Sequence, residues 1–174
     1  MKSKLKILVS SLLFLLVFSA AFAQKKEVRK EKKQKAYLEC LQLIESGEFK
    51  FEAETAYPQG GSSIDLTTNY GFIKISENKS IGDLPFFGRA FRVDYGAEGG
   101  INFEGEILKK KLTRDDKKMK VTYTFEVKDK ETYTVIMEVF SKKSASTIIR
   151  TDSKAHISYS GQLSELENEE SESK

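Results

Sequence analysis

The chain is poor in the residue types on which many enzymes and small secreted folds depend. Its 174 residues include one cysteine, one histidine, two prolines and no tryptophan. A single cysteine excludes a disulfide within the chain, and one cysteine with one histidine cannot form a structural zinc site, which needs several such ligands. We therefore expect a domain stabilised by its apolar core, with no metal ion and no other cofactor.

Long apolar runs are also scarce, and the longest lies at the N-terminus. Lys2, Lys4 and Lys6 precede an apolar run from Ile7 to Phe18, and the small-x-small sequence Ala21-Phe22-Ala23 follows it. This order of a basic start, an apolar run and small residues is typical of a secretory signal peptide. No later run approaches the roughly 20 apolar residues of a membrane-spanning helix. We predict a signal peptide over residues 1–23 and a periplasmic or secreted product without a transmembrane segment.

The mature chain has no excess of either charge. Removal of residues 1–23, which hold three of the 29 basic side chains, leaves 151 residues with 26 basic and 26 acidic side chains. General affinity for nucleic acid needs a surplus of Lys and Arg, so nucleic acid is not an expected partner. Gln24, and not a cysteine, follows the expected cleavage site near Ala23, so we expect no lipid anchor.

Charge and apolar spacing divide the mature chain into three parts. Residues 24–35 carry seven basic and two acidic side chains, whereas Tyr37, Cys40, Leu41 and Ile44 follow the spacing of an amphipathic helix. The pattern predicts a basic and then amphipathic helix over residues 24–46, ended by Gly47. A single antiparallel β domain over residues 48–163 and an acidic, disordered tail over residues 164–174 complete the chain.

The β domain shows the two-residue period of half-buried strands. Residues 120–128 and 132–140 alternate most regularly and flank a three-residue turn, which predicts an antiparallel hairpin. Further strand-like runs lie at residues 49–53, 70–76, 90–95, 101–109, 146–151 and 156–163. The predicted fold is α+β: an N-terminal amphipathic helix followed by a mostly antiparallel meander of about eight strands. The pattern leaves a curved sheet and a closed barrel open as alternatives.

The usual catalytic constellations are weak or missing. His156 shares a strand face with Ser158 and Ser160, but no Gly-x-Ser-x-Gly elbow occurs, so we interpret it as a surface histidine. Cys40 lies on the apolar stripe of the helix, where a thiol usually acts as a small buried hydrophobe. We assign no catalytic residue and predict that the protein is not an enzyme.

One aromatic segment stands out as a candidate binding site. Three phenylalanines lie within residues 86–91, and two arginines lie among or beside them. An arginine between aromatic rings can stack on them or hold an anionic group of a ligand. The predicted ligand-binding residues are Phe86, Phe87, Arg89, Phe91 and Arg92. The alternative is that residues 84–91 fill the core at a corner of the sheet, with Arg89 reaching out to water.

The same segment carries a family resemblance. Residues 84–91, Leu-Pro-Phe-Phe-Gly-Arg-Ala-Phe, are followed by Gly-Gly-Ile-Asn-Phe at 99–103 and Ile-Ser-Tyr-Ser-Gly at 157–161. Tyr57-Pro58 and residues 61–66 precede them in the same order. The chain resembles a family of small exported Bacteroidota proteins, domain of unknown function 4251, over residues 49–163. The resemblance implies a Gram-negative periplasmic location and carries no catalytic residues over.

The function that these observations favour is a non-enzymatic binding or accessory protein with an apolar or aromatic pocket. Its partner would be a small apolar or anionic ligand. A first alternative is a protein–protein interaction module of the cell envelope that uses the basic N-terminal helix. A second is a hydrolase that uses carboxylates such as Asp94, Glu104 and Glu106.

Overall fold

The computed structural model describes residues 25–92 and 99–166. The predicted signal peptide over residues 1–23 and most of the predicted tail, residues 167–174, lie outside the described residues. The chain divides into two units, Met1–Lys35 and Ala36–Lys174. Residues 25–46 are helical, and every side chain of the helical residues 25–35 in the first unit is exposed.

In the second unit, the helical residues 36–46 bury an apolar face. Tyr37, Cys40, Leu41 and Ile44, the predicted stripe, are all buried in the core of this unit. The helix ends where the sequence predicts: the backbone N–H of Gly47 donates to the Ile44 carbonyl at 3.2 Å, and Gly47 has a φ of 72°. This left-handed conformation favours glycine because it lacks a Cβ.

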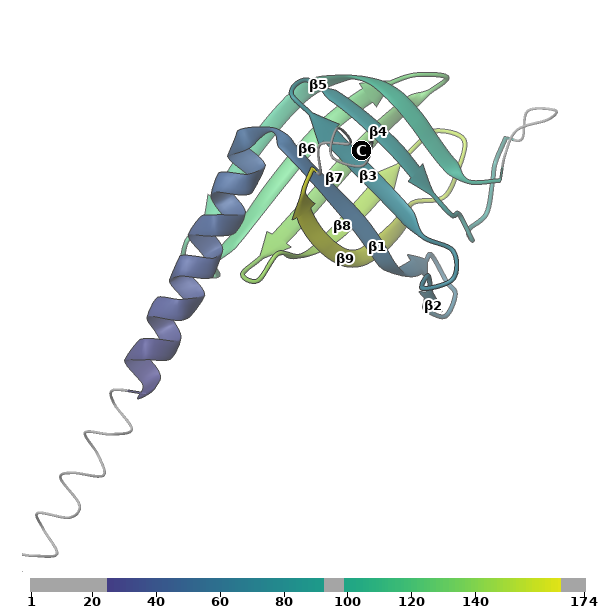
Figure 1. Cartoon of the computed structure of the whole chain (residues 1–174). Coiled ribbons are helices and arrows are strands. Elements are labelled where there is room, and N and C mark those ends of the chain that lie inside the picture. The colour runs from purple at the N-terminus through teal and green to yellow at the C-terminus, as the bar shows by residue number, and fades with distance from the viewer. Residues whose placement is uncertain (1–24, 93–98, 167–174) are drawn as a thin grey trace, which may run out of the picture. The chain divides into compact units, whose positions relative to one another are not determined.

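Within the described residues, nine antiparallel strands follow the helix. They are β1 (Glu48–Pro58), β2 (Ile64–Asp65), β3 (Gly71–Ser76), β4 (Lys79–Leu84), β5 (Ile101–Asp115), β6 (Lys120–Lys128), β7 (Thr132–Phe140), β8 (Ser144–Arg150) and β9 (Ile157–Glu165). The sheet order is β2-β1-β3-β4-β5-β6-β7-β8-β9, and β1 also pairs with β9. Eight strands therefore close into a barrel, as Figure 1 shows, and β2 is a short addition beside β1. The α+β prediction is confirmed, and the barrel is the correct alternative.

Strand β1 closes the barrel by pairing with a strand on each side. Its residues Phe49–Pro58 pair with β9, while Glu48–Ala53 pair on the other side with β3. The register with β9 shifts between Ala53 and Thr55, so the two backbones approach very closely there. A Cβ on Gly161 of β9 would collide with the Glu52 carbonyl, and this position therefore requires glycine.

Buried side chains from the strands occupy the barrel interior. Along β6 and β7 every second residue is buried, and Val121 lies opposite Val139 in the register. The largest fully buried side chains include Phe49, Phe51 and Phe125. Burial of one such phenylalanine contributes about 1.5–3 kcal/mol to stability, so the interior is the main source of stability.

The strands differ from the sequence-based expectations in three places. The described part of the strand-like run at residues 90–95, residues 90–92, is not a strand, and Ala90 makes only an isolated bridge to Lys154. Residues 93–95 lie outside the described residues. Conversely, β4 was not predicted as a strand, because its inward positions are Ser80, Gly82 and Leu84 and only one of these is a large apolar residue. The Phe103 ring fills the space beside Gly82, where a Cβ would collide with it. Strand β9 also ends at Glu165, two residues beyond the expected boundary of the β domain.

Candidate functional site

The predicted binding residues lie on the loop that leaves β4, residues 85–92, here called the aromatic loop. Its backbone pairs with the connection between β8 and β9. Ala155 N–H donates to the Arg89 carbonyl at 2.8 Å, and Phe91 N–H donates to the Ser153 carbonyl at 2.7 Å. These two bonds hold together segments about 60 residues apart in sequence, so the loop has a defined conformation without being a strand.

A buried tyrosine holds the start of the aromatic loop. Tyr159 of β9 is fully buried, and its hydroxyl donates to the Pro85 carbonyl at 2.9 Å. Burial raises the pKa of Tyr159 well above its usual value, because the phenolate would lose its hydration. The side chain therefore stays a neutral hydrogen-bond donor over the whole physiological pH range.

Phe86 has a structural role within the aromatic loop. Its ring is half-buried and packs on the core, and it lies so close to Gly88 that a Cβ there would be 2.6 Å from the ring. The Lys154 ammonium lies 5.9 Å from the ring centroid and donates to the Gly100 carbonyl at 2.9 Å. The cation over the Phe86 ring is thus Lys154, whereas the sequence suggested an arginine at this segment.

The other four predicted residues face solvent. Phe87 is 41% exposed and Phe91 is 63% exposed, and both Arg89 and Arg92 are exposed. Among the described residues, neither arginine has a carboxylate partner. Leaving a phenylalanine this exposed forgoes the stabilisation that burial would bring. The core-filling alternative therefore describes Phe86, while Phe87, Arg89, Phe91 and Arg92 form an exposed aromatic and cationic surface.

The connection between β8 and β9 is itself fixed by polar contacts. Ser153 donates to the Glu131 carboxylate through its backbone N–H at 3.1 Å and through its hydroxyl at 2.7 Å. The sequence pattern does not indicate Ser153, Lys154 or Glu131 as supporting residues. Their distance from the aromatic loop in sequence leaves no periodic signal that links them to it.

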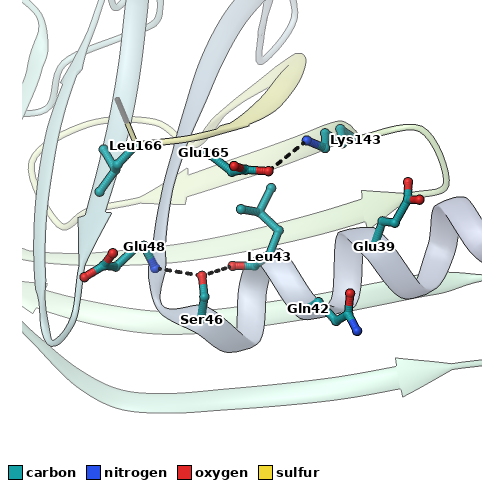
Figure 2. Close-up of a pocket in the computed structure, with 8 residues that line it drawn as sticks. All are labelled: Glu39, Gln42, Leu43, Ser46, Glu48, Lys143, Glu165 and Leu166. Atoms are coloured by element: carbon teal, nitrogen blue, oxygen red, sulfur yellow. Dashed lines mark hydrogen bonds and ion pairs between the residues drawn. The ribbon is translucent and has the colours of Figure 1, made fainter. Parts of the chain in front are cut away.

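A hollow of about 480 Å³ lies elsewhere, between the helical residues 36–46 and the end of β9 (Figure 2). Its walls combine charged and apolar side chains, among them Glu39, Glu48, Lys143, Glu165, Leu43 and Leu166. Lys143 and Glu165 form an ion pair at 3.6 Å, and the Ser46 hydroxyl donates to the Leu43 carbonyl at 2.7 Å. None of the predicted binding residues lines this hollow, which has no aromatic side chain in its wall.

The residues weighed for catalysis are dispersed. His156 is exposed just before β9, while Cys40 is buried: its thiol donates to the Phe140 carbonyl at 3.4 Å and accepts from the Lys143 N–H at 3.2 Å. These contacts tie the helix to the turn between β7 and β8. Within the described ranges, no three His, Cys, Asp or Glu side chains gather as a metal site would require.

Only two of the three carboxylates named for the hydrolase alternative lie within the described residues. Asp94 lies outside the described residues, whereas Glu104 and Glu106 lie on β5 and are exposed.

Among the residues that the structure describes, no helix is long and apolar enough to cross a membrane.

Comparison with known proteins gives a family and a fold. The family model for a domain of unknown function, DUF4251, matches residues 31–163. A crystal structure of a DUF4251 family protein from Bacteroides eggerthii DSM 20697 is similar, with a TM-score of 0.59 and 16% sequence identity over 76% of this chain and 89% of that chain. No curated protein matches. The match extends over most of the barrel and its helix, and the chain belongs to the DUF4251 family.

Proposed function

We propose that this protein is an exported binding protein that acts without catalysis, and that the aromatic loop is its recognition surface. The observation that carries the proposal is the contrast within the loop. Its backbone is held by bonds to residues 153–155 and to Tyr159, yet Phe87 and Phe91 remain exposed. A loop that is ordered before binding loses little conformational entropy on binding.

The chemistry of the exposed side chains favours an amphipathic anion as the ligand. Phe87 and Phe91 offer apolar surface, and the guanidinium groups of Arg89 and Arg92 can each bind a carboxylate or phosphate through paired hydrogen bonds. Among the described residues, neither arginine has a carboxylate partner that an incoming anion would have to displace. The proposed recognition surface is the exposed side of the aromatic loop. Binding there does not require the pocket that the sequence led us to expect.

Native mass spectrometry tests the proposal. The mature protein, purified gently from its native host, should carry a stoichiometric extra mass that organic extraction removes. The Phe87→Ala/Phe91→Ala variant should lose that mass. The control Ile81→Ala/Phe140→Ala removes two other exposed apolar side chains, 40% and 38% exposed, on β4 and β7 and should keep it. Equal extra mass in both variants would refute this location of the site.

A second candidate is the interaction module based on the basic helix. It is favoured by one observation: residues 25–35 are helical with every side chain exposed, and they include seven basic residues. Such local charge speeds association with an acidic partner in a salt-sensitive way. Deletion of residues 24–35 should abolish capture of an envelope protein partner and leave the ligand of the aromatic loop bound; the reverse result would reject this candidate.

A further inference from the structure

A second concentration of positive charge lies at the β5–β6 turn. Residues 109–120, here called the basic hairpin, contain seven basic and two acidic side chains. The basic ones are Lys109, Lys110, Lys111, Arg114, Lys117, Lys118 and Lys120. Because the mature chain as a whole is expected to be neutral, this charge is a local feature and does not follow from the overall composition.

The register of β5 explains why the basic hairpin is exposed. Strand β4 pairs only with Ile101–Glu106 of β5, so beyond this point β5 has β6 as its single neighbour. A register shift between Leu108 and Lys111 and a left-handed Lys109, with a φ of 49°, interrupt the edge. Lysines and bulges at the edge of a sheet prevent pairing with strands of other molecules. This protection explains why lysines occur at positions 109–111 on the edge, but it does not explain the lysines in the turn.

Nearby acids neutralise only part of the basic hairpin. Lys109 pairs with Glu126 at 2.9 Å, Lys120 with Glu138 at 2.5 Å, and Arg114 with Glu45. Both aspartates of the hairpin are engaged: Asp116 accepts a hydrogen bond from the Tyr37 hydroxyl at 2.7 Å, and Asp115 accepts one from the Lys118 N–H at 3.1 Å.

Three lysines of the hairpin remain available to an external anion. In the described part of the chain, Lys110, Lys111 and Lys117 have no carboxylate partner, and Lys110 contacts only the Asn78 amide oxygen, at 3.0 Å. All three are exposed. Leu108, immediately before the hairpin, is an apolar side chain that is 41% exposed.

We propose that the basic hairpin binds the surface of a bilayer that contains anionic phospholipid. A bilayer presents phosphates over a plane, so it can neutralise lysines on the edge and in the turn together without a shaped pocket. Each lysine near such a surface contributes about 1 kcal/mol. The exposed Leu108 side chain adds apolar contact at the headgroup boundary, a contribution that a purely acidic peptide would not use.

The test is flotation of the full mature protein with vesicles of phosphatidylcholine and phosphatidylglycerol in a three-to-one ratio, against phosphatidylcholine alone. We expect binding only to the mixed vesicles, and release at about 1 M salt, where the screening length falls to about 3 Å. The Lys110→Gln/Lys111→Gln/Lys117→Gln variant should bind more weakly by a factor on the order of 100, since about 1 kcal/mol per lysine is roughly fivefold.

A matched control separates local from overall charge. Lys128→Gln/Lys130→Gln/Lys142→Gln removes the same charge from exposed positions outside the hairpin and should bind as the wild type does. Equal weakening of both variants, equal binding of wild type to both vesicle types, or binding that depends only on residues 25–35 would overturn the proposal. Capture of an acidic protein with no vesicle binding would do so too. None of these outcomes bears on the ligand of the aromatic loop.

Discussion

The two ends of the barrel are closed by opposite means. At the helix end, apolar side chains such as Leu41 and Ile44 are buried, and the adjoining β5–β6 hairpin exposes lysines. At the other end, hydrogen bonds with the Tyr159 hydroxyl and with the backbone of residues 153–155 hold the aromatic loop, and phenylalanines are exposed. Where polar hydrogen bonds hold the structure together, aromatic side chains can remain exposed and available for binding. Where buried apolar side chains do so, charged side chains can remain exposed instead.

Truncation of an apolar side chain should give the largest difference in the free energy of unfolding between the two ends. Ile44→Ala removes a buried side chain at the helix end and should lower the free energy of unfolding by about 2–4 kcal/mol. Phe87→Ala removes an exposed side chain at the loop end and should change it by no more than about 0.5 kcal/mol. Urea unfolding of both variants measures this contrast. A large loss in Phe87→Ala would show that the aromatic loop stabilises the fold.

Removal of one hydroxyl should affect the loop end by a smaller amount. Tyr159→Phe leaves the Pro85 carbonyl without its 2.9 Å donor and should cost about 1–2 kcal/mol. Hydrogen exchange of the Ala155 and Phe91 amides should accelerate, because these amides bond the same loop. If exchange at these amides stays as slow as in the wild type, Tyr159 does not hold the loop.

Alkaline pH should weaken the helix end through Tyr37. Burial and the hydrogen bond to Asp116 raise the pKa of Tyr37 to about 12, from an ordinary value of 10.0. The folded state therefore holds this proton more tightly than the unfolded state. Its contribution to stability is complete below pH 10 and is lost between pH 10 and 12.

Thermal unfolding across this pH range measures the effect. Tyr133, whose pKa burial also raises to about 12, contributes in the same direction. The Tyr37→Phe variant should therefore lose part, and not all, of the decline in stability. A variant with the wild-type decline would exclude Tyr37 as a source.

The smallest effect is expected for the ion pair at the helix end. Arg114 and Glu45 are 50% and 42% exposed, and such pairs contribute about 0.2–1 kcal/mol. Arg114→Gln should lower the free energy of unfolding by an amount in this range, and less so as salt is raised. A loss as large as that of Ile44→Ala, measured by urea unfolding, would show that charge and not burial closes this end.

Much of the local structure could be predicted because it follows from side-chain spacing. The stripe from Tyr37 to Ile44 and the alternation of β6 and β7 are both found as predicted. The prediction of a strand at residues 90–95 is wrong for the described residues 90–92, because long-range backbone bonds impose a loop where the local pattern resembles a strand. Strand β4 was missed because a neighbouring ring fills the space that a larger side chain would use.

The candidate sites show the same division. Composition alone singled out the aromatic loop, but it could not separate the half-buried Phe86 from the exposed Phe87 and Phe91. The charge of the basic hairpin is visible in the sequence, whereas its exposure depends on where β4 stops pairing with β5.

The sequence by itself determined the helix and most of the strands, because periodic burial and turn residues act over a few neighbouring positions. The family resemblance came from specific motifs, such as residues 84–91 and 157–161, and not from periodicity. The tertiary structure decided that the sheet closes, through the pairing of β1 with β9. It also decided which aromatic and basic side chains stay exposed. These outcomes depend on contacts between residues some 20 to 120 positions apart, for which a single sequence has no periodic signal.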